Sequence, residues 1–246
     1  MKDVGKKDAE NWKRIWNAKQ ANMKILQSED IESVFMELKR LDGNDTLGNG
    51  GISYAAFRKQ YEIVKRNFQG DREPVKSVFE AGCGSGPFLY LLQSEGIQVG
   101  GMDYSEVHIS AAKSVLLHPM ELYCEEAIYL RTDVKYDCVF TNSMFEYFCD
   151  YEYALKVLEK MYEKSNYAVA ILDVHDKKRE DDFIAYRRSM IEDYDIKYNG
   201  LGKLFFEREF FIDFAISHNM DIKITSSKYD EYWNRDFVFD IYLYKN

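Results

Sequence analysis

The sequence lacks an excess of basic charge. Its 246 residues hold 33 Lys and Arg against 42 Asp and Glu, which gives a formal net charge of −9, and they contain no long basic run. Proteins that wrap nucleic acid neutralise its phosphates with clustered Lys and Arg. The composition therefore argues against a nucleic-acid partner.

Paired cysteines and long apolar runs are also missing. The cysteines form no CxxC pair and stand among apolar or small residues: Cys83, Cys124, Cys138 and Cys149. We interpret them as reduced, buried thiols, and no metal site is expected. No apolar run reaches the ~20 residues of a transmembrane helix, and the N-terminus is charged, unlike a signal peptide. These features favour a cytoplasmic protein without membrane contact.

The sequence does contain the material for a large core. Hydrophobic residues make up 46% and aromatic residues 15% of the chain. A chain of this length favours one large α/β domain with additions over two separate folds. Nothing in the composition indicates an oligomeric state.

The most informative stretch runs from Val78 to Gly86. An apolar run ends in Glu80, three glycines alternate with small residues (Gly82, Gly84 and Gly86), and a helix-like apolar run follows. A strand that turns tightly into a helix needs glycine where a Cβ would meet a ligand or strain the backbone. The following helix offers unpaired N–H groups to whatever lies on the turn. The stretch therefore predicts a nucleotide-type cradle.

Two common nucleotide-binding motifs do not fit this stretch. A P-loop requires Lys and Ser or Thr after the glycines, whereas Pro87 and Phe88 follow here. A dinucleotide fingerprint has a wider spacing before its third glycine. A glycine-rich turn without any ligand stays open as an alternative.

A second strand-like run, from Val99, ends in Asp103, about twenty residues after the cradle. In a βαβ unit this places a carboxylate at the tip of the neighbouring strand, where it can accept hydrogen bonds from ribose hydroxyls. Tyr104 adjoins it. The alternative for Asp103 is an acid that only stabilises the next helix N-terminus.

The stretch Val78–Gly86 resembles motif I of the class I S-adenosylmethionine-dependent methyltransferases, roughly (V/I)-L-E/D-x-G-x-G-x-G. The resemblance implies S-adenosylmethionine as the cofactor and extends over about residues 75–175. The segments 42–51, 171–173 and 204–206 resemble the small-molecule methyltransferases of bacterial polysaccharide, capsule or natural-product gene clusters.

Two further segments resemble the family. Glu126 and Ala127 stand where many members place an acid and an alanine beside the adenine. The segment 136–148 resembles motif IV, which implies that Asn142 and Ser143 face the cofactor and that Tyr147 faces the acceptor. It lacks the proline of DNA base methyltransferases.

The pattern of elements predicts a Rossmann-like α/β fold. Strands are expected near 75–81, 98–103, 121–124, 136–142, 167–173, 221–228 and 237–244, with helices between them on both faces. The family resemblance implies seven strands, mostly parallel, with the last one antiparallel. We divide the chain into an N-terminal helical cap (1–70) and a methyltransferase core (71–246) with an insertion at about 176–210. The resemblance implies that the cap folds over the site, with Tyr54 and Trp16 able to reach the methionyl end of the cofactor or the substrate; core packing stays open as the alternative for both side chains.

Methyl transfer to a neutral hydroxyl needs a base, and three acids or bases stand near predicted strand ends. The first candidate is His175, just past the fifth strand. The second is Asp173, which could orient His175 or act as the base itself, and the third is Glu146. For an anionic acceptor, Lys203 and Arg235 are candidate ligands. For each of these residues, the alternative to a functional role is a solvated side chain without one.

The sequence thus predicts an S-adenosylmethionine-dependent methyltransferase with a small-molecule acceptor. The expected reaction is O-methylation of a sugar-linked, nucleotide-linked or phosphorylated metabolite. Three alternatives stay open: N-methylation of a small amine or amino sugar, a nicotinamide-dependent oxidoreductase, and a non-catalytic scaffold of the same fold.

Overall fold

A computed structural model describes residues 2–44, 51–70, 73–226 and 231–246. Its centre is a seven-stranded sheet in the order β3-β2-β1-β4-β5-β7-β6. The strands are β1 (Ser77–Ala81), β2 (Gln98–Asp103), β3 (Glu121–Cys124), β4 (Tyr136–Asn142), β5 (Ser165–His175), β6 (Met220–Ser226) and β7 (Val238–Lys245). Strands β1 to β5 pair in parallel, and β7 is antiparallel to both β5 and β6. This confirms the predicted Rossmann-like sheet.

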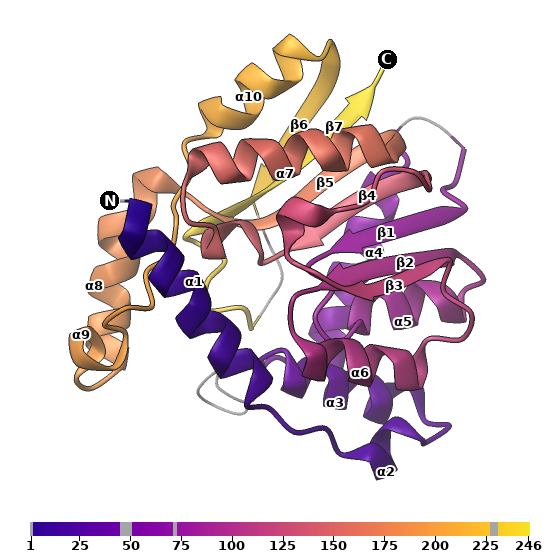
Figure 1. The fold of residues 1–246 in the computed structure, drawn as a ribbon, viewed down its shortest axis with the longest axis horizontal. Helices are drawn as coiled ribbons and strands as arrows, with labels where there is room; N and C mark the ends of the chain where they lie inside the picture. The colour runs from indigo at the N-terminus through magenta and orange to yellow at the C-terminus, as the bar shows by residue number, and fades with distance from the viewer. Residues whose placement is uncertain (1, 45–50, 71–72, 227–230) are drawn as a thin grey trace.

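Helices cover both faces of the sheet (Figure 1). The helices of the core are α5 (Pro87–Ser94), α6 (Glu106–Val115), α7 (Tyr151–Lys164), α8 (Glu180–Met190), α9 (Tyr194–Lys197) and α10 (Arg208–Ser217), with short 3-10 turns η2 (Ala127–Tyr129), η3 (Phe145–Tyr147) and η4 (Lys177–Arg179). Side chains alternate along each strand. In β1, Val78 joins one buried cluster with α5 and α6, and Phe79 joins the other with α7 and α10.

The N-terminal segment forms α1 (Lys2–Asn17), α2 (Met23–Leu26), α3 (Ile31–Leu41) and α4 (Tyr54–Phe68). Ser53 caps α4 by accepting a hydrogen bond from the Ala56 N–H (3.3 Å), as its position before the apolar pattern predicts. Helices α3 and α4 help to fill one face of the sheet, where Tyr61 and Phe68 pack on Phe88 and Phe140. The predicted boundary at residue 71 lies outside the described residues.

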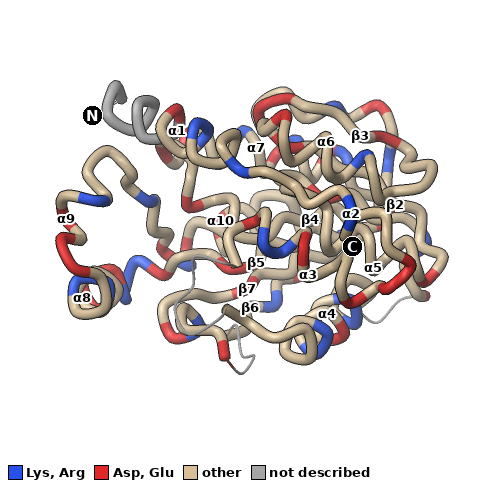
Figure 2. The backbone as a smooth tube through the Cα atoms, turned by 90° about the horizontal axis from the view of Figure 1, so that it is seen from below, with Lys and Arg blue, Asp and Glu red and all other residues tan. Residues whose placement is uncertain are grey.

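The segment 176–210 carries α8 and α9, which stand out to one side of the sheet (Figures 1 and 2). Lys and Arg alternate with Asp and Glu along the chain instead of gathering in one stripe (Figure 2). Among the described helices, none combines the length and apolar character needed to cross a bilayer.

Candidate active site

A cavity of ≈ 410 Å³ lies at the carboxyl ends of β1, β2 and β4. Its floor is the glycine turn after β1, and its walls are the segments that follow β2, β3 and β4. Helices α1, α3 and α4 also line it. In a doubly wound sheet, the carboxyl ends of the strands are where ligands bind.

The glycine turn requires its glycines. Gly82 and Gly84 have φ of +70° and +54°, which other residues rarely adopt. A Cβ on Gly84 would lie 2.6 Å from Oδ1 of Asp42, and one on Gly82 would lie 2.5 Å from the sulfur of Met144. Gly86, with φ of +80°, immediately precedes α5. The turn is therefore both left-handed and closely packed, and the predicted cradle lines the cavity.

Glu80 is a buried carboxyl whose Oε2 has no hydrogen-bond partner among the residues that the structure describes. Burial raises the pKa of Glu80 well above its ordinary value, and the nearby Asp42 and Asp103 raise it further. An orphaned acceptor in a cavity wall is costly unless a ligand donates to it. This position fits a cationic donor such as an ammonium group.

Asp103 lies at the tip of β2, as predicted. Its Oδ2 accepts a hydrogen bond from the Gly84 N–H (3.0 Å) and its Oδ1 accepts one from the Ser105 N–H (2.8 Å). The carboxylate is thereby fixed against the glycine turn. Tyr104, Glu126 and Ala127 line the same end of the cavity.

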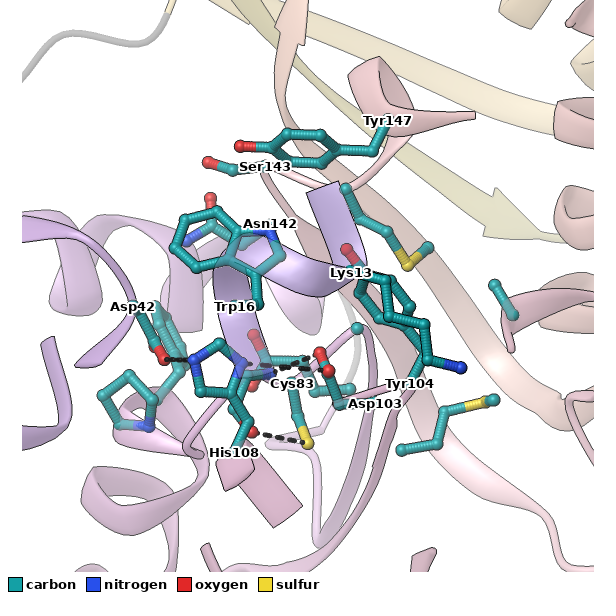
Figure 3. A pocket seen from close by; sticks show the side chains of 18 of the residues that line it. Lys13, Trp16, Asp42, Cys83, Asp103, Tyr104, His108, Asn142, Ser143 and Tyr147 are labelled. Carbon is teal, nitrogen blue, oxygen red and sulfur yellow. Dashed lines mark hydrogen bonds and ion pairs between the residues drawn. The ribbon is translucent and has the colours of Figure 1, made fainter. Parts of the chain in front are cut away.

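His108, to which the sequence assigned no role, also lines the cavity. Its ring lies between two carboxylates: Nε2 is 3.9 Å from Oδ1 of Asp42 and Nδ1 is 3.9 Å from Oδ1 of Asp103 (Figure 3). Burial opposes the charged ring, but the two carboxylates outweigh it and raise the pKa of His108. The Asp42 contact joins residues 66 positions apart, so no local pattern reveals it.

Changing His108 to glutamine is expected to cost stability mainly at low pH. The folded protein holds the His108 proton more tightly than the unfolded chain does, because the folded pKa lies above its ordinary value of 6.5. This contribution to the free energy of unfolding is fully present below the unfolded pKa and is lost as pH rises through the folded pKa. Urea unfolding between pH 5.5 and 9 measures the difference between wild type and H108Q.

That difference should shrink as pH rises. The exposed His118 provides the matched control, H118Q. A difference for H108Q that stays constant across the pH range would mean that the ring contributes packing alone.

Behind the tip of β4 lies a network of buried carboxyl groups. The hydroxyls of Ser143 and Tyr232 both donate to Oδ2 of Asp173. Oδ1 of Asp173 is buried and has no hydrogen-bond partner in the described part of the chain, and burial raises the pKa of this residue. Asn142 and Ser143 line the cavity, so Asp173 supports the cavity wall from behind.

Glu146 belongs to the same network and is only 2% exposed. Burial raises the pKa of Glu146 to about 7; Lys203 opposes this shift and Asp173 adds to it. Nζ of Lys203 lies 3.5 Å from Oε1 of Glu146 and 4.9 Å from the centroid of the Tyr147 ring. Oε2 of Glu146 has no hydrogen-bond partner within the described ranges. The structure thus brings three predicted site residues together: Glu146, Lys203 and Tyr147.

The structure places His175 elsewhere. Its ring is fully buried between Phe183 and Phe205, with centroids 4.8 and 5.0 Å away, and Nε2 is 3.2 Å from Nδ2 of Asn234. Burial keeps the pKa of His175 well below its ordinary value. His175 is not among the residues that line the cavity.

Of the predicted substrate ligands, Lys203 contacts Glu146 but does not line the cavity, and two others lie elsewhere. Tyr54 packs edge-on against Phe35, with ring centroids 5.4 Å apart. Arg235 is exposed, 3.9 Å from Asp236. Neither lines the cavity.

Two side chains of helix α1 line the cavity: Trp16, a predicted possible contact of the cap, and Lys13, which no sequence pattern indicated (Figure 3). On the adjacent turns of the helix, Asn11 and Trp12 donate hydrogen bonds to the carbonyls of Gly200 (2.8 Å) and Gly202 (3.2 Å). Helix α1 and the segment 176–210 therefore meet beside the cavity, a contact that only the tertiary structure reveals.

The structure corrects the predicted burial of the cysteines. The four cysteines form no disulfide with one another, but Cys124 is exposed and Cys149 is partly exposed, so the prediction that all four are buried is wrong. Cys124 is exposed because it ends the edge strand β3. In the described part of the chain, no group of three or more His, Cys, Asp or Glu is arranged to hold a metal ion.

A family model described as a methyltransferase domain matches residues 54–209. The chain belongs to this methyltransferase family. The match begins with α4 and ends within α10, so it spans the glycine turn, the tip of β4 and the segment with α8 and α9. No curated protein matches the methyltransferase by sequence.

Solved structures resemble the methyltransferase in fold. One is magnesium protoporphyrin IX methyltransferase (ChlM) from Synechocystis PCC 6803 with bound SAM: 16% identity, TM-score 0.58, covering 94% of this chain and 100% of that one. Another is the plantazolicin methyltransferase BpumL in complex with SAH: 16% identity, TM-score 0.59, covering 97% of this chain and 99% of that one. Both comparisons extend over nearly the whole chain and agree with the sheet described above.

Proposed function

We propose that this methyltransferase transfers a methyl group from S-adenosylmethionine to a hydroxyl oxygen of a sugar-linked small molecule. The observation that carries the proposal is a single cavity with the glycine turn and Asp103 at one end and the loop after β4 at the other. Solved structures of similar fold that contain SAM or SAH support the choice of cofactor. A role in polysaccharide or natural-product biosynthesis inside the cell is part of this proposal.

The cavity's own residues fit the cofactor. S-adenosylmethionine carries a sulfonium and an ammonium, and the acidic side chains of the cavity wall match that positive charge: Asp42, Glu80, Asp103, Glu125 and Glu126. The unpartnered Oε2 of Glu80 suits an ammonium donor. Asp103 suits the ribose hydroxyls.

The cofactor supplies an activated methyl group, so the protein's part is alignment, exclusion of water and removal of a proton. Trp16 and Tyr147 line the cavity with ring centroids 6.3 Å apart and exclude water from it. Glu146 is the base in this proposal: it does not itself line the cavity, but it directly precedes the cavity-lining Tyr147, and its Oε2 has no hydrogen-bond partner among the described residues. Asp173 acts through Ser143, whose hydroxyl it holds.

A neutral hydroxyl acceptor is favoured by Oε2 of Glu146, a buried acceptor atom next to the cavity-lining Tyr147. This atom needs a donor, and a sugar hydroxyl donates. The cavity wall is rich in acidic side chains, which disfavours an acceptor that carries phosphate. The same acidic side chains favour a second candidate, N-methylation of a small amine or amino sugar. In either case we propose that residues 1–70 act as a cap and residues 176–210 as an insertion beside the acceptor.

Calorimetric titration tests the reaction class. S-adenosylmethionine and S-adenosylhomocysteine are expected to bind with micromolar affinity, and NADH, the control, is not expected to bind. Binding of NADH alone would support the oxidoreductase alternative, and binding of none would support the scaffold. Sugar nucleotides and amino sugars can then be screened for methyl acceptance.

A further inference from the structure

Helix α3 places two charged side chains, Lys39 and Asp42, in the cavity wall. They are three residues apart at the C-terminal end of the helix, so they project from neighbouring positions on one side. Lys39 belongs to no motif that the sequence indicated, and Asp42 begins the segment 42–51, in which no site residue was predicted. Asp42 lies against the glycine turn, and Lys39 acts electrostatically on Glu80.

Asp42 is fixed against the glycine turn through one of its two carboxylate oxygens. Its Oδ1 accepts hydrogen bonds from the Ser85 N–H (2.9 Å) and the Ser85 hydroxyl (2.8 Å). That hydroxyl also donates to the Leu38 carbonyl (2.8 Å), which docks α3 on the turn. Oδ2 of Asp42 has no hydrogen bond to any described residue.

Lys39 is a cation without a carboxylate partner in the part of the chain that the structure describes. Its Nζ lies 4.7 Å from the centroid of the Phe57 ring. Its charge acts on Glu80 and on Asp173, whose carboxyl pKa values it lowers against the effect of burial. Lys39 lines the cavity, and its half-buried ammonium is available there to an anionic ligand group.

These positions match the two charges of an amino acid. Asp103, at the tip of β2, marks the ribose site, and Lys39 and Glu80 lie in the neighbouring part of the same cavity wall. A zwitterion there needs one cation for its carboxylate and acceptors for its ammonium, and the wall offers Lys39, Oε2 of Glu80 and Oδ2 of Asp42.

We propose that Lys39 and Asp42 bind the amino-acid end of the cofactor: Lys39 holds its carboxylate, and Asp42 with Glu80 holds its ammonium. The inference rests on the proposed function and extends it, since it makes the N-terminal helices part of cofactor recognition. It also means that ligands with the same nucleoside but no amino acid bind without help from α3.

The test compares two ligands by calorimetry: S-adenosylhomocysteine and 5′-methylthioadenosine, which shares the adenosine and the thioether sulfur but has no amino acid. In K39M, S-adenosylhomocysteine is expected to bind ~10- to 100-fold more weakly, the range of one lost charge-assisted hydrogen bond. Binding of 5′-methylthioadenosine should change less than twofold, which also shows that the variant is folded. D42N keeps the acceptor for Ser85 and should likewise weaken only S-adenosylhomocysteine.

Lys13 provides the matched control inside the same cavity. Its Nζ lies 5.7 Å from the Tyr104 ring centroid, at the nucleoside end, so K13M is expected to leave the ratio of the two affinities unchanged. An unchanged ratio in K39M would overturn the inference while leaving the proposed function in place. A wild type that binds neither ligand would overturn the proposed function, and this inference with it.

Discussion

Replacing Glu146 with glutamine is expected to lower kcat by about 10²- to 10⁴-fold, the usual contribution of a general base. The carboxyl group must be ionised to accept a proton, and its pKa is about 7. The kcat of the wild type should therefore fall as pH decreases below about 7 and level off above it. E146Q should lose this pH dependence together with the activity.

Steady-state kinetics across pH 5.5–9 measures both effects, and calorimetry checks that E146Q still binds the cofactor. Glu192, an exposed residue of the insertion, provides the matched control E192Q. If E146Q turns over normally, Glu146 is not the base, and the buried pair with Lys203 is structural.

Replacing Asp103 with alanine is expected to weaken cofactor binding by more than ~10-fold. The carboxylate can accept a pair of charge-assisted hydrogen bonds from the ribose, each worth ~1.5–3 kcal/mol. It also accepts hydrogen bonds from the N–H groups of Gly84 and Ser105, so its loss loosens the turn as well. Titration with S-adenosylhomocysteine measures the change.

D103N separates these two roles. Asparagine keeps one acceptor oxygen for the turn but removes the charge, so D103N should keep the melting temperature of the wild type more closely than D103A does. Both variants should lose affinity. Wild-type affinity in both would refute the ribose assignment.

At the end of β5, the sequence predicts the positions of the residues but not the directions of their side chains. The sequence placed Asp173 and His175 at the end of the fifth strand, and both are there. It did not predict which way each side chain points. Strand β5 pairs with β7 through a register shift between Ile171 and Val174, and Asp173 itself has φ of +61°. These irregularities break the alternation that a sequence pattern assumes, and His175 ends among aromatic rings.

Several residues of the cavity wall were not predicted, and the reason is long-range packing. Trp16 and Asp42 reach the cavity through α1 and the end of α3, which are distant in sequence from the glycine turn, and His108 contacts the distant Asp42 as well as the nearby Asp103. A single sequence carries no signal for such contacts, because periodicity reports only which face of a helix is apolar. Trp16 falls on a helical stripe that predicts core packing equally well.

The sequence by itself determined the glycine turn, the acid at the tip of β2, the helix cap at Ser53 and the order of strands and helices. These features follow from local physics: glycine at positive φ, a side chain that caps a helix, and alternation along a strand. Only the tertiary structure decided that α1 and α3 line the cavity, that Glu146 is buried beside Lys203 and that His175 is enclosed. Burial, pKa and side-chain direction depend on which distant segments pack together, and that is set by the whole fold.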